Sequence, residues 1–81
     1  MNNELFNKVN TILFQDWDPL SVNDRGPSDE YSAYVPHLLV LINSNASREE
    51  IATHLNTLVI NMASADDYAH CLKVADKLLQ I

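Results

Sequence analysis

The sequence of 81 residues has little of what marks several classes of protein. Its single glycine, Gly26, cannot form the glycine-rich loop that binds a phosphate. Its single cysteine, Cys71, excludes an internal disulfide and fits a reducing compartment. The longest purely apolar run, residues 38–42, is far shorter than the roughly 20 residues of a transmembrane helix, and the first residues do not resemble a signal peptide. We therefore expect a cytoplasmic protein without a membrane span.

Basic residues are also scarce. Lysine and arginine total five against eleven aspartates and glutamates, so the formal net charge is −6. Five of the acids and only one base lie between Asp16 and Glu30, so this segment alone carries −4. Proteins that bind nucleic acid or anionic membranes need basic patches, so we expect neither partner. A localised acidic segment instead favours a basic protein partner and speeds the encounter with it.

Apolar residues are abundant, at 47%, and they recur at helical spacing. The pattern predicts an all-α fold, a small four-helix bundle in a single domain covering residues 1–81. The expected helices cover residues 3–16, a second segment ending near 43, residues 48–62 and residues 66–79. Ser47 and Glu50 match a capping box at the start of the third helix, and Ser64 is a candidate N-cap for the fourth. A domain this small buries only about 60% of its surface, which disfavours an enzyme with a deep cleft.

A long acidic loop is expected between the first two helices. The first helix should end near Trp17, because Asp18 precedes Pro19 and is pushed out of the helical region. The loop then runs to Ser28, a candidate N-cap, with Gly26 in a turn. The acidic segment would therefore lie mainly in a connection between helices.

The second helix has two alternatives because of Pro36, which lacks an N–H and clashes with the preceding turn of a helix. Either one helix over 29–43 is kinked at this proline, or a short turn at 29–34 precedes a helix that begins near Val35. A buried strand over 38–42 also fits the apolar run. The helix is favoured, because no second strand in the sequence could pair with it.

The candidate residues for chemistry do not form a known motif. The sequence contains three histidines, His37, His54 and His70. Two of them follow an acid by four residues, but the spacing matches no His–Glu–x–x–His or paired-cysteine site. Cys71 lies beside His70, yet neighbouring residues point about 100° apart around a helix, so they form no nucleophile–base pair. We expect no metal, no cofactor and no catalytic site, with Cys71 a small buried hydrophobe.

The candidate partner-binding site combines acids with aromatic rings. It consists of Asp16, Trp17, Asp18, Asp24, Asp29, Glu30, Tyr31 and Tyr34. Aromatic anchors surrounded by charge are typical of binding hot spots. The alternative places Trp17 and Tyr31 in the core, as a lid over the end of the bundle, with Tyr34 half exposed. A second alternative makes Asp29 and Glu30 the first turn of a helix, where acids suit the helix dipole.

Several of these residues also carry a resemblance to a known family. The matching segments are Trp17-Asp18-Pro19 with Val22, Asp29-Glu30-Tyr31 with Tyr34, Ala46-Ser47 with Glu50-Ile51-Ala52, and the last helix. Together they cover roughly residues 4–80, and they resemble small bacterial proteins of the YugE-like type. The sequence departs from that pattern at Ser21, where the family has glycine, and at Ser32, where it has aspartate. The resemblance implies a compact helical bundle.

The resemblance also implies a function, because similar proteins serve as immunity proteins in contact-dependent growth inhibition. The leading hypothesis is an immunity protein whose acidic surface binds and neutralises a cognate toxin domain, most simply a nuclease. Nucleases have positively charged sites to hold phosphate, which an acidic inhibitor complements. The alternative is a small cytosolic adaptor or regulator, and a homo-oligomer is compatible with either hypothesis. A metal protein or an enzyme is the least favoured class.

Overall fold

The computed structural model describes residues 3–19 and 31–81, and within them the regular structure is entirely helical, as predicted. The elements are α1 (Asn3–Ile12), a π-helical turn η1 (Leu13–Trp17), a 3-10 turn η2 (Ser32–Tyr34), α2 (Val35–Asn43), α3 (Arg48–Ala63) and α4 (Tyr68–Leu79). The predicted acidic loop, including Gly26 and the candidate N-cap Ser28, falls in residues 20–30, outside the described residues.

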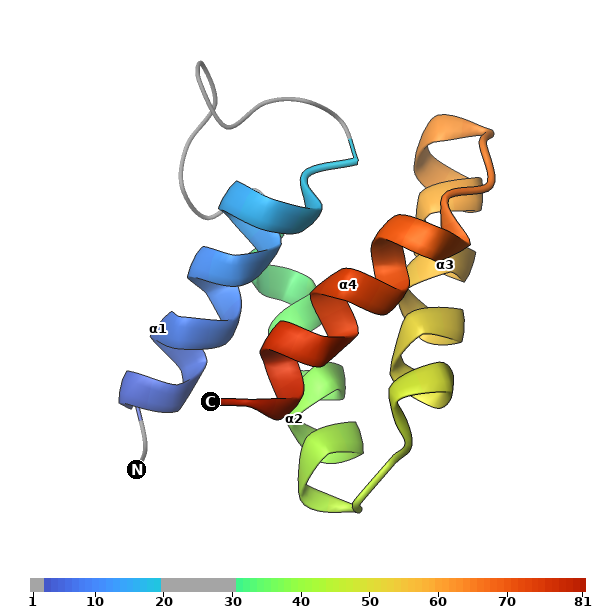
Figure 1. Ribbon diagram of the computed structural model, residues 1–81. Coiled ribbons are helices and arrows are strands. Elements are labelled where there is room, and N and C mark those ends of the chain that lie inside the picture. Colours follow the sequence, from blue (N-terminus) through green and yellow to red (C-terminus); the bar gives the residue numbers. More distant parts are fainter. Residues whose placement is uncertain (1–2, 20–30) are drawn as a thin grey trace.

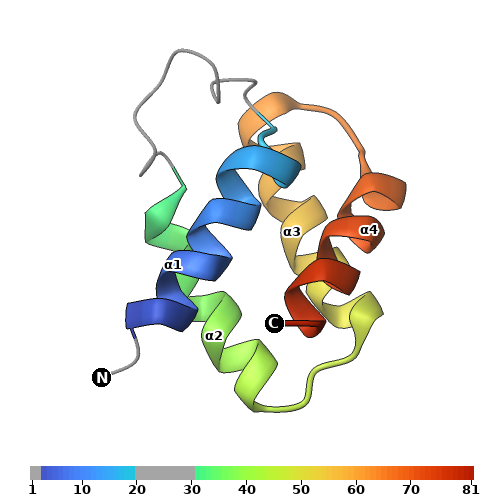
Figure 2. The ribbon, with the colours of Figure 1, turned by 60° about the vertical axis from the view of Figure 1, so that its left-hand side comes forward.

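The four α-helices pack around one core (Figure 1). The most extensive contact joins α3 to α4, while α1 packs against α2 and α4. Seen from a second direction, α1 lies in front of α2, and α3 and α4 run side by side (Figure 2). The turn η1 also contacts α4, so the end of the first helix and the last helix meet at one end of the bundle. None of the helices described in the structure is both long and apolar enough to cross a bilayer.

The core confirms most of the predicted apolar stripes. On α3, Ile51, Leu55 and Val59 are buried as the helical spacing predicts. On α4 the buried residues are Cys71, Val74, Ala75 and Leu78. Leu79, which belongs to the predicted apolar stripe of this helix, is 42% exposed. Leu79 follows Leu78 by one residue, which rotates it about 100° around the helix and out of the core.

The second helix begins where one of the two alternatives put it. The α2 helix starts at Val35, so Pro36 lies in its first turn, and the prediction of a kinked helix over 29–43 is wrong. The first N–H groups of a helix have no acceptor within it, so a proline there forfeits no hydrogen bond. The strand alternative for residues 38–42 is also wrong, since this run lies within α2.

The predicted capping box at the start of α3 is confirmed. The Glu50 backbone N–H donates to the Ser47 hydroxyl at 3.1 Å, and the Ser47 N–H donates to the Glu50 carboxylate at 3.0 Å. Two N–H groups that lack acceptors within the helix are thereby satisfied.

Ser47→Ala should lower the free energy of unfolding by about 1 kcal/mol, because it removes the hydroxyl that accepts the Glu50 N–H. Urea denaturation followed by circular dichroism measures the loss. Ser44→Ala is the matched control, because Ser44 is exposed and follows α2 instead of starting a helix. Equal losses in the two variants would contradict the capping role.

The prediction of Ser64 as an N-cap is wrong. Ser64 ends α3 in the left-handed conformation, with φ of 56°, and α4 begins only at Tyr68. Asn56 links the two helices instead, because its amide donates to Asp66 at 3.0 Å and its oxygen accepts the Asp67 N–H at 2.8 Å. The Asp66 carboxylate in turn accepts the Tyr68 N–H at 3.1 Å.

Candidate functional site

The candidate site is built on the end of the first helix, which widens into the π-helical turn η1 before it stops. The Asp18 N–H donates to the Leu13 carbonyl oxygen at 2.9 Å, five residues back, and this bond closes the turn. Asp18 itself is left-handed, with φ of 31° and ψ of 62°. Aspartate tolerates this region better than most residues, and the following Pro19 disfavours a right-handed helical conformation. The helix therefore ends where the sequence predicts.

Trp17 and Tyr31 join the two sides of the site through their rings. The ring centroids are 5.3 Å apart with an interplanar angle of 66°, an edge-to-face arrangement, and Tyr34 makes a second such contact with Trp17 at 6.2 Å. Only 3% of Trp17 and 1% of Tyr31 is exposed, so the core alternative for these rings describes the structure. In this conformation they support the site and offer a partner almost no area. Tyr34 remains half-buried.

The Tyr31 hydroxyl links the aromatic rings to the first acid beyond the helix. It donates to the Asp18 carboxylate at 2.7 Å, a part-buried hydrogen bond between residues 13 positions apart. A hydrogen bond to a carboxylate is shorter and stronger than one between neutral groups. The bond therefore holds together the two chain segments that flank the acidic residues outside the described part.

The α4 helix compensates part of the charge at the same end of the bundle. Lys77 lies 3.0 Å from the Asp16 carboxylate, and His70 Nε2 lies 2.6 Å from the Asp16 carbonyl oxygen. A carbonyl oxygen only accepts, so His70 must carry a proton on Nε2 to make this bond. The Lys77 pair is partly exposed, and such pairs add about 0–1 kcal/mol. Asp16 therefore has a cationic partner on α4.

Cys71 lies beneath the site and is fully buried, as predicted for a small hydrophobe. Burial raises the pKa of the Cys71 thiol, the Trp17 indole N–H partly offsets the rise, and Asp67 and Asp66 add to it. A thiol with a raised pKa stays protonated at neutral pH, whereas a nucleophilic cysteine needs its thiolate. The environment of Cys71 is therefore that of a packed core residue.

The structure describes five of the eight predicted site residues. It brings together Asp16, Trp17, Asp18, Tyr31 and Tyr34, which come from η1, the residue after it, the residue before η2 and the last residue of η2. The other three, Asp24, Asp29 and Glu30, lie outside the described residues, and so does the alternative that the last two begin a helix. Residues 19 and 31 therefore mark the borders of the described site.

The histidines take positions that sequence spacing alone does not reveal. His70 bonds to the Asp16 carbonyl, while His37 and His54 from different helices stack on each other. Within residues 3–19 and 31–81, no group of three His, Cys, Asp or Glu side chains is arranged to hold a metal ion. Contacts between helices depend on packing, so helical periodicity carries no signal for them.

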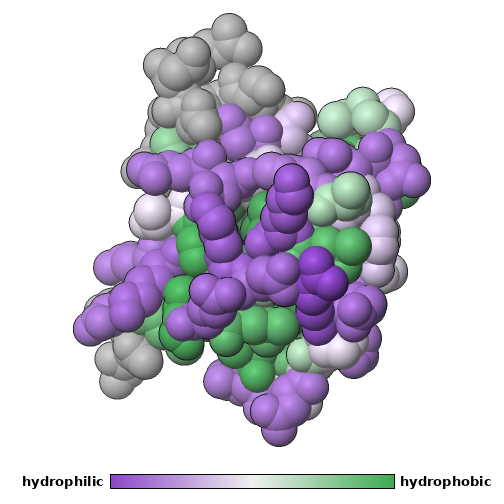
Figure 3. Space-filling view, in the orientation of Figure 1, coloured by the Kyte–Doolittle hydropathy of each residue, from purple (hydrophilic) through white to green (hydrophobic). Residues whose placement is uncertain are grey.

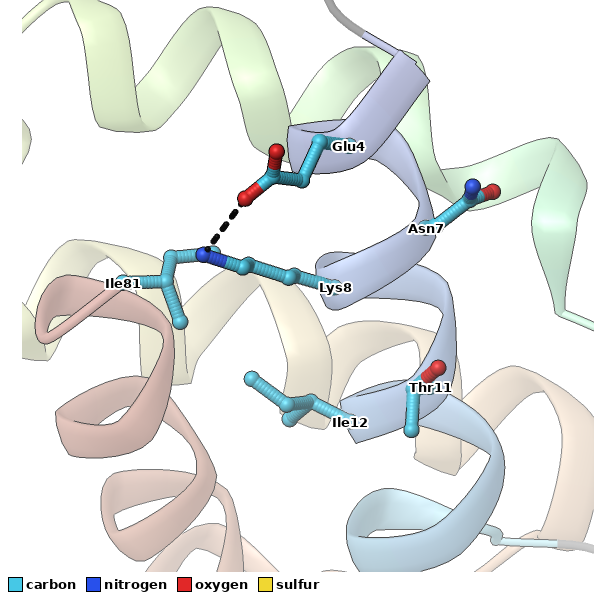
Figure 4. Close-up of a pocket in the computed structure, with 6 residues that line it drawn as sticks. All are labelled: Glu4, Asn7, Lys8, Thr11, Ile12 and Ile81. Carbon is cyan, nitrogen blue, oxygen red and sulfur yellow. Dashed lines mark ion pairs between the residues drawn. The ribbon is translucent and has the colours of Figure 1, made fainter.

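A separate hollow lies between α1 and the C-terminal residue. It has a volume of about 580 Å³ and is lined by Glu4, Asn7, Lys8, Thr11, Ile12 and Ile81. Ile12 and Ile81 point into the same space, and the Glu4–Lys8 ion pair of 3.2 Å borders it (Figure 4). Apolar patches also show between polar side chains on this face of the molecule (Figure 3). The lining has no histidine, cysteine or serine.

Among known proteins, no family model, no curated protein and no solved structure matches this chain. The resemblance to YugE-like proteins therefore stays a prediction. The chemistry of the chain therefore rests on its own residues, which include Asp16 and Asp18 beside the buried Trp17 and Tyr31 rings.

Proposed function

We propose that this chain is an immunity protein that binds and neutralises a cognate toxin domain through an acidic face. The face consists of Asp18, Asp24, Asp29 and Glu30, with Tyr34 at its border. The observation that carries the proposal is the concentration of charge, since residues 16–30 hold −4 of the net −6. The protein acts in the cytoplasm, without a cofactor, by occupying the toxin and not by catalysis.

The contacts of the described residues support this choice of face. Asp16 has Lys77 as its partner, so the excess negative charge resides in the segment that follows it. Asp18 is held by Tyr31, which packs on the buried Trp17 ring. An acid whose position is fixed before binding loses less conformational entropy when it meets a basic group. Asp18 is therefore fixed in position at the end of the bundle, where the proposed face begins.

The chemistry of the target follows from the sign of the charge. A nuclease holds the phosphates of its substrate with lysine and arginine, so its active face is basic. An acidic protein is attracted to that face, associates quickly and excludes the substrate. The proposed partner is therefore a basic toxin domain, with a nuclease the class that fits best.

Mixing the purified chain with the toxin domain encoded beside its gene tests the proposal. We expect a tight complex that weakens as salt is raised and that abolishes the activity of the toxin. A complex without inhibition would favour the adaptor alternative. Absence of a complex at low salt would contradict the proposed function.

The acidic face should control how fast the complex forms. Asp24→Asn combined with Asp29→Asn should slow association about tenfold at low salt, because it removes two charges that steer the encounter. Stopped-flow fluorescence or surface plasmon resonance measures the rate. Glu4→Gln combined with Glu49→Gln changes the net charge equally at two exposed sites outside the face and is the matched control. Equal slowing by both pairs would show that only net charge matters and would contradict a localised face.

A further inference from the structure

Two histidines outside the acidic face bring α2 and α3 into contact. The rings of His37 and His54 stack with centroids 4.3 Å apart and an angle of 30° between their planes. His37 is exposed and His54 is partly buried. Neutral imidazole rings can remain at this distance, whereas two protonated rings would place two positive charges there. Protonation of both rings would therefore weaken this contact.

The charged side chains near the stack are two carboxylates at the start of α3, and both already have partners. His37 is the one titratable side chain of α2. On α3, Glu49 and Glu50 line the hollow of about 410 Å³ next to His54, together with Leu41 and Thr53. The Glu50 carboxylate already accepts the N–H of the capping serine at 3.0 Å, and Glu49 lies 4.0 Å from an arginine. Both carboxylates thus have partners at the start of α3.

The charged groups on the helices packed against α3 and α2 form ion pairs away from the two histidines or are exposed. On α4, Asp76 lies 2.7 Å from Arg48, Lys77 pairs with an acid of η1, and Lys73 is exposed. On α1, the neighbour of α2, Glu4 and Lys8 pair with each other. Among charged groups, His37 is the one that lowers the pKa of His54.

We propose that the His37–His54 stack is an acid-sensitive joint between α2 and α3, closed when both rings are neutral and opened when both are protonated. The α2 helix contributes Val35 and Leu38 to the core, so separation of the two rings weakens the packing of α2 on the bundle. This device is independent of the proposed function, because none of its residues belongs to the acidic face.

The sign of the pH dependence follows from the environment of His54. Burial lowers the pKa of His54 below its ordinary value of 6.5, and His37 lowers it further. The unfolded chain, in which the pKa returns to its ordinary value, then binds more protons than the folded chain. Above about pH 6.5 His54 is neutral in both the folded and the unfolded chain, and it costs no stability. As the pH falls from there through the lowered pKa of folded His54, the free energy of unfolding decreases.

An NMR titration of the histidine ring protons in the full chain tests the joint directly. We expect His54 to titrate below its ordinary pKa, and its midpoint to rise in His37→Phe, which keeps a ring but removes the charge. We also expect the cross-relaxation signal between the two rings to disappear as acid protonates both of them, while that between Trp17 and Tyr31 persists. An unchanged His54 midpoint in His37→Phe, or a ring-to-ring signal that survives with both rings charged, would overturn the proposal.

A double-mutant cycle gives an independent measurement. With His37→Phe, His54→Phe and the double variant, the coupling between the two sites should alter the unfolding equilibrium constant by at least about twofold more at about pH 5 than at about pH 7.5. His70→Gln is the control for a histidine outside the stack, and it should leave this coupling unchanged. A coupling that does not change with pH would overturn the joint, whether or not the chain inhibits a toxin.

Discussion

Trp17→Ala should lower the free energy of unfolding by about 3–5 kcal/mol, the largest effect of any single change considered for this chain. Trp17 is 3% exposed and lies at the end of the π-helical turn η1, where it packs edge-on against Tyr31 and Tyr34. Truncation removes the apolar area of the indole and both ring contacts, and it leaves a cavity beside Cys71. A domain of this size has a total stability of only about 4–12 kcal/mol, so the variant should be partly unfolded at physiological temperature.

Urea denaturation measures this loss, and two variants control for it. Trp17→Phe keeps a ring in the core and should lose less than Trp17→Ala. Phe14→Ala removes an aromatic ring from the same turn, but Phe14 is only partly buried, so its loss should also be smaller. A Trp17→Ala variant as stable as the parent chain would mean that the ring is not part of the core.

Tyr31→Phe should cost about 1.5–3 kcal/mol, although it removes a single oxygen atom. The Tyr31 hydroxyl donates to the Asp18 carboxylate at 2.7 Å, and the ring is 1% exposed. The carboxylate then loses a charge-assisted bond at a part-buried position, while the ring remains in place. If the proposed function holds, the same change should weaken toxin binding, because Asp18 is no longer held at the base of the acidic face.

Tyr34→Phe is the matched control for Tyr31→Phe. Its hydroxyl reaches only the Met62 sulfur at 3.7 Å, a weak acceptor, so its removal should change the free energy of unfolding much less. Combining Tyr31→Phe with Asp18→Asn completes a double-mutant cycle, in which we expect a coupling of about 0.5–3 kcal/mol. Equal effects of the two tyrosine changes would argue against a special role for the bond to Asp18.

The helical positions and most helix ends could be predicted because they depend on local rules. The capping box at Ser47 and Glu50 satisfies N–H groups within a single turn, and the Asp18-Pro19 pair ends a helix by local steric conflict. The N-cap prediction for Ser64 is wrong for an equally local reason. A serine suits an N-cap, but the chain uses Ser64 as a left-handed C-cap of α3.

The candidate site was predictable in composition but not in its internal contacts. Acids and aromatic rings close together in the sequence indicated one region, and Asp16, Trp17, Asp18 and Tyr31 do meet there. The partners from α4 could not be predicted, because Lys77 and His70 lie more than fifty residues further along the chain. Sequence alone likewise left open whether Trp17 and Tyr31 are exposed anchors or core residues, since an aromatic ring suits both environments.

By itself, the sequence determined that this chain is all-helical, acidic and poor in the motifs of catalysis, because helical periodicity, net charge and short-range caps are properties of neighbouring residues. Only the tertiary structure decided that Trp17 and Tyr31 are buried, that Lys77 forms an ion pair with Asp16, and that His37 stacks on His54. These features join residues from different elements, so they form only when the helices pack together. Exclusion of water stabilises the buried rings, whereas the Lys77–Asp16 pair is electrostatic. The acidic segment is thus a property of the sequence, and the contacts that Asp16, Trp17, Asp18 and Tyr31 make are a property of the fold.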